Sequence, residues 1–125
     1  MNNILNKFSS YSHFLPRAVL AITFLVHGYP KLTNPTPMVE MGLPLLIVYL
    51  VGLFEVGGAV LLLYGIKEDW ATRIGSILLA VIMLGAIFMV HLQHGWSGME
   101  WQVLILAVCL LYATKGNAIN EGNQT

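Results

Sequence analysis

The sequence predicts an all-α membrane protein, a four-transmembrane-helix antiparallel bundle. Composition and the placement of the charges predict it. Of the 125 residues, 57% are hydrophobic and only 10% are charged, whereas an ordinary globular domain carries about 25% charged residues. The apolar residues also gather in four long runs that contain few charges, as in chains that cross a bilayer. The formal net charge of zero provides no electrostatic footprint for a nucleic acid.

Residues 1–13 are predicted to form an N-terminal interfacial segment. Ile4, Phe8, Tyr11 and Leu15 recur at spacings of four, three and four residues. This spacing places them in one stripe of a helix, which suits a helix that lies on the membrane surface. A partly ordered tail is the alternative for the same residues.

Residues 14–116 are predicted to form the four-helix membrane domain. The four spans cover approximately Phe14–Leu32, Gly42–Ile66, Trp70–Leu92 and Met99–Thr114. A spanning helix needs about 20 residues, so the fourth span is short, with Trp101 and Tyr112 as interfacial aromatics at its ends. The connections are short and contain proline, glycine or charged residues, so consecutive helices should be antiparallel neighbours. Residues 117–125 are predicted to be a polar, flexible tail.

The basic residues predict the orientation of the chain in the cell membrane. One membrane side receives both termini, the second connection and five basic residues: Lys7, Arg17, Lys67, Arg73 and Lys115. The opposite side receives only Lys31. Basic residues favour the cytoplasmic side, so we expect a multi-pass protein with both termini in the cytoplasm.

Glu55 is the sharpest candidate for a functional residue. It lies about thirteen residues into the second span, or roughly 20 Å along a helix that rises 1.5 Å per residue. A charge near the bilayer centre costs at least about 2.5–3.5 kcal/mol on insertion scales, so Glu55 needs a partner or a function. A catalytic role in proton or ligand handling is one interpretation, and a structural hydrogen bond is the other. Arg17, Lys31 and Arg73 are the candidate cations beside it.

A group of polar residues is predicted at the membrane face opposite the termini. His27 and Lys31 share a helix face if their helix continues through Pro30. Three further residues reach the same membrane face in the predicted topology: His91, His94 and Glu100. The interpretations are a structural or interfacial role, contact with a quinone or another small ligand, and a metal site built from imidazoles and a carboxylate. We assign no metal to this group.

Other chemical motifs do not occur in the sequence. It contains no Cys-x-x-Cys motif, no haem-type histidine pair within the spans, no nucleotide-binding glycine loop and no nucleophile elbow. The single cysteine, Cys109, excludes an intrachain disulfide and is expected to be a small packing residue. Catalysis by this chain alone is therefore poorly supported.

The order of the polar and glycine motifs resembles the DoxX family of small four-helix membrane proteins. The matching residues extend over about residues 15 to 116 and are Arg17, His27-Gly28-x-x-Lys31-Leu32, Glu55-x-Gly57-Gly58, Gly65, Arg73, Met83, Ala86, His91 and Gly98-x-Glu100. The family usually has an asparagine or a second glycine before the glutamate that corresponds to Glu100. Here the segment is Gly95-Trp-Ser-Gly-Met-Glu100, which departs from that pattern in the third connection.

The resemblance implies a link to redox chemistry. One branch of the family looks like the membrane subunit of a thiosulfate:quinone oxidoreductase, and others are tied to thiol and oxidative-stress enzymes. The first hypothesis is therefore a redox-linked subunit, associated with a membrane oxidoreductase, that contacts quinone. In it Glu55 is catalytic and handles a proton, while Arg17, His27 and Lys31 contact quinone oxygens or orient Glu55. Three residues complete the predicted polar network: Arg73, His91 and Glu100.

Two other hypotheses come from different classes of function. A non-catalytic accessory subunit would pack against a larger membrane enzyme, and its glycine-lined helices would allow close packing. A small transporter is the third hypothesis, although inverted repeats are not evident. In every case the partners are the lipid bilayer and other membrane or redox subunits, or further copies of the chain. Any enzyme activity is at most that of a subunit in a quinone-linked oxidoreductase.

Overall fold

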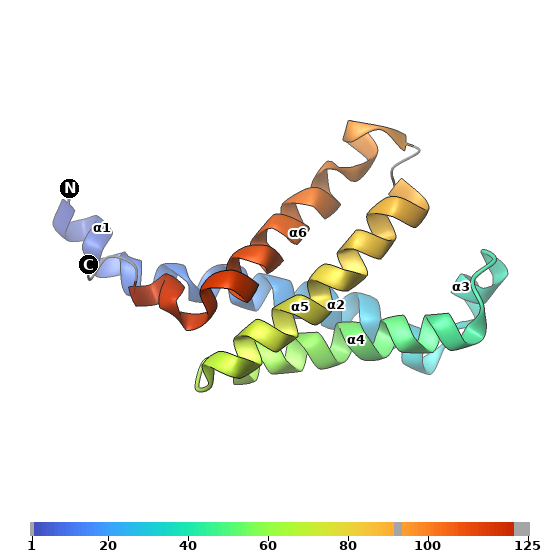
Figure 1. Cartoon of the computed structure of the whole chain (residues 1–125), viewed down its shortest axis with the longest axis horizontal. Helices are drawn as coiled ribbons and strands as arrows, with labels where there is room; N and C mark the ends of the chain where they lie inside the picture. Colours follow the sequence, from blue (N-terminus) through green and yellow to red (C-terminus); the bar gives the residue numbers. More distant parts are fainter. Residues whose placement is uncertain (1, 92–93, 122–125) are drawn as a thin grey trace.

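The computed structural model describes residues 2–91 and 94–121, and within these ranges every regular element is a helix (Figure 1). The elements in chain order are α1 (Asn2–Ser12), α2 (Phe14–Thr33), α3 (Thr36–Glu40), α4 (Leu45–Tyr64), α5 (Asp69–Ala86), the π-helical turn η1 (Ile87–His91), α6 (Trp96–Lys115) and the 3₁₀ helix η3 (Gly116–Glu121). The prediction of an all-α bundle is confirmed.

The four long helices form two antiparallel pairs. Helices α2 and α4 lie side by side, and α5 and α6 form the second pair (Figure 1). The pairs lie together at the end that holds the α4–α5 turn and the end of α6, and they diverge toward α3 and the α5–α6 connection (Figure 1). The short connections therefore make consecutive helices neighbours, as expected, but they do not fix the angle between the two pairs, which is open.

Two pairs of glycines allow the helix backbones to approach closely. A Cβ atom on Gly28 of α2 would lie 3.2 Å from the carbonyl oxygen of Gly52 on α4. A Cβ atom on Gly75 of α5 would lie 2.8 Å from the carbonyl oxygen of Gly58 on α4. Small residues of this kind favour helix association in a membrane, where burial of apolar surface between helices gives little driving force.

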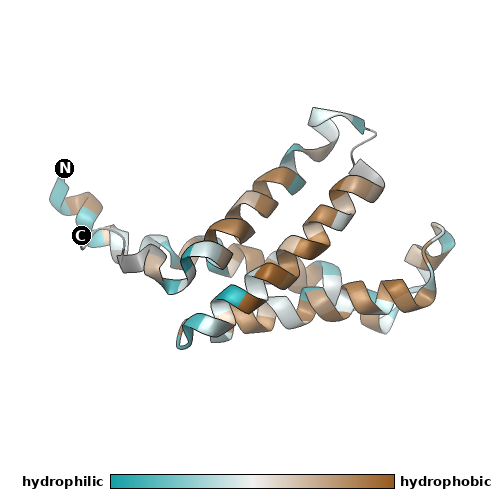
Figure 2. Ribbon diagram, in the orientation of Figure 1, coloured by the Kyte–Doolittle hydropathy of each residue, from teal (hydrophilic) through white to brown (hydrophobic). Residues whose placement is uncertain are grey.

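The buried core lies where the two pairs meet. Each of the four long helices contributes to it, with Leu20, Ala21, Phe24, Ala59, Leu62, Leu79, Ala80, Cys109 and Tyr112. Hydrophobic residues also cover much of the outer faces of α4, α5 and α6 (Figure 2). A surface of this composition suits contact with lipid rather than with water.

Among the described residues, three helices are long and apolar enough to cross a membrane, and they cover Leu45–Tyr64, Asp69–Met89 and Trp96–Ala118. The last is longer than the predicted Met99–Thr114 span. Helix α6 begins at Trp96, directly after Gly95. Gly95 has a φ of 75°, a conformation that glycine adopts easily, and it forms the boundary between the connection and the helix. Helix α2 has 20 residues and runs through Pro30 to Thr33, as the shared face of His27 and Lys31 required.

The predicted tail begins inside an ordered element. Helix η3 continues from α6 through Glu121, and the side chain of Asn117 enters the interior of the protein. The remainder of the predicted tail, residues 122–125, lies outside the described residues.

Candidate functional site

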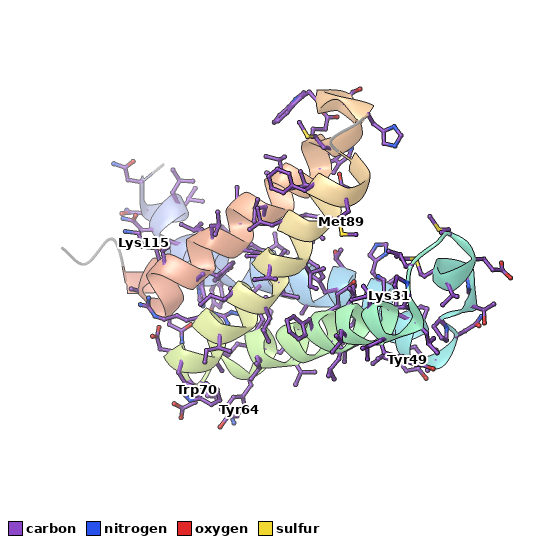
Figure 3. All side chains as sticks on the ribbon, turned by 45° about the vertical axis from the view of Figure 1, so that its right-hand side comes forward. Lys31, Tyr49, Tyr64, Trp70, Met89 and Lys115 are labelled. Carbon is purple, nitrogen blue, oxygen red and sulfur yellow. The ribbon has the colours of Figure 1, made fainter. Side chains whose placement is uncertain are left out.

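Glu55, which is buried, forms an ion pair with the partly buried Lys31 between α2 and α4. The Lys31 Nζ atom lies 2.7 Å from Glu55 Oε1, and the two side chains are 14% and 4% exposed. The same ammonium donates a second hydrogen bond, of 3.0 Å, to the carbonyl oxygen of His27. Lys31 is therefore the cation beside Glu55, and the other two candidates, Arg17 and Arg73, bind elsewhere. Figure 3 labels Lys31 near the end of α2, beside α4.

The two glycines between α2 and α4 explain why this pair can form. Gly28 precedes Lys31 by three residues, and Gly52 precedes Glu55 by three. A Cβ atom on Gly28 would lie 2.7 Å from the Cβ of Glu55, and one on Gly52 would lie 2.9 Å from the Cβ of Lys31. Each glycine therefore makes room for the charged residue of the opposite helix.

The Lys31–Glu55 ion pair contains groups that can bind a ligand and exchange a proton with it. A buried charge is costly unless it is paired and hydrogen-bonded, and Lys31 supplies that pairing to Glu55. An ammonium group carries three hydrogens, of which two are used by Glu55 and the carbonyl of His27. The third can bind an acceptor on a ligand, and the carboxylate beside it can hold or release a proton.

Arg17 lies in a second buried centre, close to the α4–α5 turn. Its NH1 atom donates to the carbonyl oxygen of Leu62 at 2.5 Å and to Thr72 Oγ1 at 2.8 Å. Its NH2 atom donates to Asn117 Oδ1 at 2.8 Å. The guanidinium carbon also lies 5.2 Å from the ring centre of Tyr112, a distance that allows a cation–π interaction. The carbonyl oxygen of Gly65 accepts from Thr72 Oγ1 at 3.0 Å and from the Asn117 amide at 2.7 Å. We call Arg17, Thr72, Asn117 and the carbonyl groups of Leu62 and Gly65 the Arg17 centre.

Arg73 binds the C-terminal end of α6. Its side chain donates to the carbonyl oxygens of Thr114 at 2.8 Å and Lys115 at 3.2 Å, and its Nε atom donates to Asp69 Oδ2 at 2.8 Å. Asp69 also accepts a 2.7 Å hydrogen bond from the backbone N–H of Asn117. A cation at a helix C-terminus satisfies carbonyl groups that the helix leaves free and interacts favourably with its dipole.

The predicted cluster of histidines with Glu100 does not form around Lys31 among the described residues. His27 is exposed, and its backbone oxygen, rather than its imidazole, contacts Lys31. His94 is exposed and Glu100 is half-buried. His94 precedes α6 and Glu100 belongs to its first two turns, and the start of α6 lies away from the α3 end of α2 (Figure 1). The side chain of His91 lies outside the described residues. Within the described ranges, no three histidine, cysteine or acidic side chains come close enough to hold a metal ion.

An open groove of about 370 Å³ lies on the surface of the α2–α4 pair. It is lined by Leu25, Val26, Tyr29, Pro30 and Val56. None of the charged candidates belongs to this lining, so the groove is not an extension of the ion pair.

Three residues of these polar contacts were missed by the sequence analysis. Thr72 is a polar residue near the start of an apolar helix. Because a buried threonine needs a hydrogen-bond partner, its position could have predicted a polar contact there. Asn117 had no such signal, since it belongs to a polar segment at the end of the chain. Asp69 lies in the charged connection between two predicted spans, where a carboxylate needs no partner and therefore gives no signal.

The fold and the site define a small, all-helical integral membrane protein with a charged pair buried between two of its helices. The DoxX family model matches residues 13–92. A protein of Bacillus subtilis (strain 168), named "Putative oxidoreductase CatD", is 30% identical over 118 residues, which cover 90% of this chain and 85% of that protein. The chain therefore belongs to the DoxX family. No solved structure matches it.

Proposed function

We propose that the protein is a redox-linked membrane subunit in which Glu55 handles a proton beside a quinone. The observation that carries the proposal is the Lys31–Glu55 ion pair, which is nearly buried between helices and keeps one ammonium hydrogen available. The name of the Bacillus subtilis relative, an oxidoreductase, supports the same class of chemistry.

The residues present fit a polar head group with carbonyl oxygens. A quinone supplies two-electron, two-proton redox chemistry when it is bound, and the associated oxidoreductase exchanges the electrons. If quinol were oxidised at this place, the Glu55 carboxylate would be the group that accepts one of the two protons, and the other would pass to water. Lys31 donates a hydrogen bond to the ligand oxygen and holds the Glu55 carboxylate in place. Quinone reduction runs the same transfers in the opposite direction.

The topology that we propose with this function has four passes and both termini in the cytoplasm. A 20-residue helix is about 30 Å long, which matches the hydrocarbon core of a bilayer. The two charges that lower the hydropathy of α2 are withdrawn from lipid, because Arg17 is 1% exposed and Lys31 is paired with Glu55. Apolar residues such as Val19, Ile22 and Val26 are left on the outer face of the helix.

The test replaces Glu55 with glutamine and measures quinone-dependent oxidoreductase activity in membranes that contain the native partners. Loss of a positioned acid–base group typically lowers the rate by about 10²–10⁴-fold, so we expect a loss of at least about a hundredfold. Glu40→Gln is the matched control, because Glu40 is an exposed carboxylate on α3. Wild-type turnover in a folded Glu55→Gln protein would exclude the proposed role.

A non-catalytic accessory subunit is the second candidate function, and the surface of α6 favours it. Only Cys109 and Tyr112 of this helix are buried, while Trp101, Leu104 and Leu111 are 66%, 54% and 48% exposed. Their spacings of three and seven residues place them on one helix face. That face would pack against the transmembrane part of a larger enzyme.

The accessory role is tested by native purification of the tagged chain in mild detergent, followed by mass spectrometry. We expect a stoichiometric membrane or redox protein to co-elute with the wild-type chain. Ala107→Trp, on the exposed face of α6, should remove it, while Val26→Trp on the exposed face of α2 should not. A chain that elutes alone as a stable species would count against this role.

A further inference from the structure

The Arg17 centre contains a buried cation without a carboxylate. Arg17 is 1% exposed, and the ion pairs found among the described residues join other side chains. Its hydrogen-bond acceptors are neutral oxygens of Leu62, Thr72 and Asn117. Its Nε atom is buried and has no hydrogen-bond partner within the described ranges. A buried guanidinium of this kind is costly unless other groups balance its charge.

One helix end and an aromatic ring balance this charge in part. Leu62, whose carbonyl oxygen accepts a hydrogen bond from Arg17, lies in the last turn of α4. The C-terminal end of a helix carries a partial negative charge of about one half. The ring of Tyr112 adds a cation–π interaction. None of these groups is an anion, so the centre remains favourable for one.

Asn117 occupies the position that an anionic oxygen would take. Its Oδ1 atom lies 2.8 Å from both Arg17 NH2 and Thr72 Oγ1, and its amide nitrogen donates to the carbonyl oxygen of Gly65 at 2.7 Å. The carboxamide oxygen is neutral, so its bond with Arg17 is a charge–dipole contact, whereas an anionic oxygen would add the attraction of two opposite charges in a partly buried place. An anion would therefore gain more from Arg17 and Thr72 than the neutral carboxamide does.

Withdrawal of the segment that carries Asn117 would break the hydrogen bond from its backbone N–H to Asp69 Oδ1, but it would not require a long helix to move. Asn117 belongs to η3, which follows Gly116 at a φ of 55°. Gly116 is the connection between α6 and η3, and glycine adopts left-handed and right-handed backbone conformations with similar ease. Rotation at this residue would withdraw the carboxamide and leave Arg17, Thr72 and the end of α4 in place.

We propose that the Arg17 centre is a phosphate-binding site, that Asn117 occupies it in this structure, and that displacement of η3 admits the phosphate of an anionic phospholipid. Arg17 lies in the first turn of α2 and Thr72 in the first turn of α5, so the centre belongs to the depth of the lipid headgroups. Lys67 belongs to the α4–α5 turn and Lys115 ends α6, two segments at the same end of the protein (Figure 1). Both lysines are exposed and would attract anionic headgroups. Inorganic phosphate presents the same oxygens, and the test separates the two sources.

The test compares Asn117→Ala with Asn117→Asp in the full-length protein. Binding of phosphatidylglycerol and of phosphatidylcholine is measured by native mass spectrometry in detergent. Asn117→Ala removes the competing carboxamide and should bind phosphatidylglycerol about tenfold more tightly than the wild type, the factor expected when one ordinary hydrogen-bonding competitor is removed. Asn117→Asp places a tethered carboxylate beside Arg17 and should bind no more tightly than the wild type. Lys7→Gln, at an exposed basic residue of α1, should leave binding unchanged.

A second arm of the test measures inorganic phosphate without lipid. Tighter phosphate binding by Asn117→Ala in that arm, with no preference for phosphatidylglycerol, would support the site and assign it to a free oxyanion. Equal binding of both ligands by the wild type and both Asn117 variants would overturn the proposal, as would an equal gain in both variants. Protection of the Cys109 thiol from maleimide reports that each variant is folded. Asn117→Ser replaces Asn117→Ala if that protection is lost.

Discussion

Replacing Gly28 with alanine tests whether the close approach of α2 and α4 holds the ion pair together. The new Cβ atom would lie 2.7 Å from the Cβ of Glu55, 3.0 Å from Val56 Cγ2 and 3.2 Å from the carbonyl oxygen of Gly52. Two of these atoms are rigidly attached to the α4 backbone, so the helices must separate to relieve the contact. Overpacking of a tightly packed contact costs about 1–3 kcal/mol, and separation also lengthens the Lys31–Glu55 ion pair.

The single thiol of Cys109 provides the assay. Cys109 is fully buried, so its labelling by a water-soluble maleimide in mild detergent reports the population of opened molecules. A loss of about 1–3 kcal/mol increases that population roughly five- to 150-fold, and the labelling rate of Gly28→Ala should rise by this factor. Gly57→Ala is the matched control, because a Cβ atom there meets nothing within 4 Å. Labelling of Gly28→Ala at the wild-type rate, or an equal change in the control, would refute the reasoning.

Three further substitutions can be measured with the same thiol assay. Lys31→Met leaves the Glu55 carboxylate buried without its cation and should lower the free energy of unfolding by about 3–5 kcal/mol. Adding Glu55→Gln to this variant should restore part of the lost stability. A double variant as unstable as Lys31→Met would argue against the ion pair. Gly116→Ala puts a side chain at a φ of 55° and against the Asp69 carboxylate, so we expect a loss of roughly 1–2 kcal/mol or more. Arg73→Ala removes the contacts with Asp69 and with the last carbonyl groups of α6. The arginine is 41% exposed, so we expect labelling to increase by no more than about fivefold, and a larger increase would contradict the small contribution expected of such exposed contacts.

Two features could be predicted from the sequence. The helices depend on local sequence, and the need of Glu55 for a polar partner follows from the free-energy cost of a charge in the bilayer. Long apolar runs predict helices of about the right length in a membrane, and breakers end them. The cost of a charge at depth requires a partner for Glu55 whichever helices are neighbours. The choice of Lys31 over Arg17 could not be predicted, because it depends on the register between α2 and α4. Gly28 and Gly52 set that register through contacts that appear only in three dimensions.

The Arg17 centre was beyond prediction for a different reason. Arg17 and Asn117 are separated by 100 residues, and their contact requires α2, α5 and η3 to be arranged first. A single asparagine in a polar segment has no periodicity that would predict burial. The angle between the helix pairs is equally non-local, and it decides that Glu100 lies away from Lys31 although both were predicted at one membrane face.

The direction of the Lys31 side chain gives a test of what holds the ion pair. A lysine near the end of a membrane helix usually extends toward the headgroups, but Lys31 turns the other way. Its Nζ atom binds Glu55, three residues beyond Gly52 on α4, and the carbonyl oxygen of His27, one turn back on α2. If the Glu55 charge holds it there, Glu55→Gln should release the ammonium toward water. Labelling by a membrane-impermeant amine reagent, measured on the Lys31 peptide, should then increase several-fold, while Lys67, which is already exposed, should label as before. Unchanged protection of Lys31 would mean that packing against Gly52, and not the carboxylate charge, fixes the side chain.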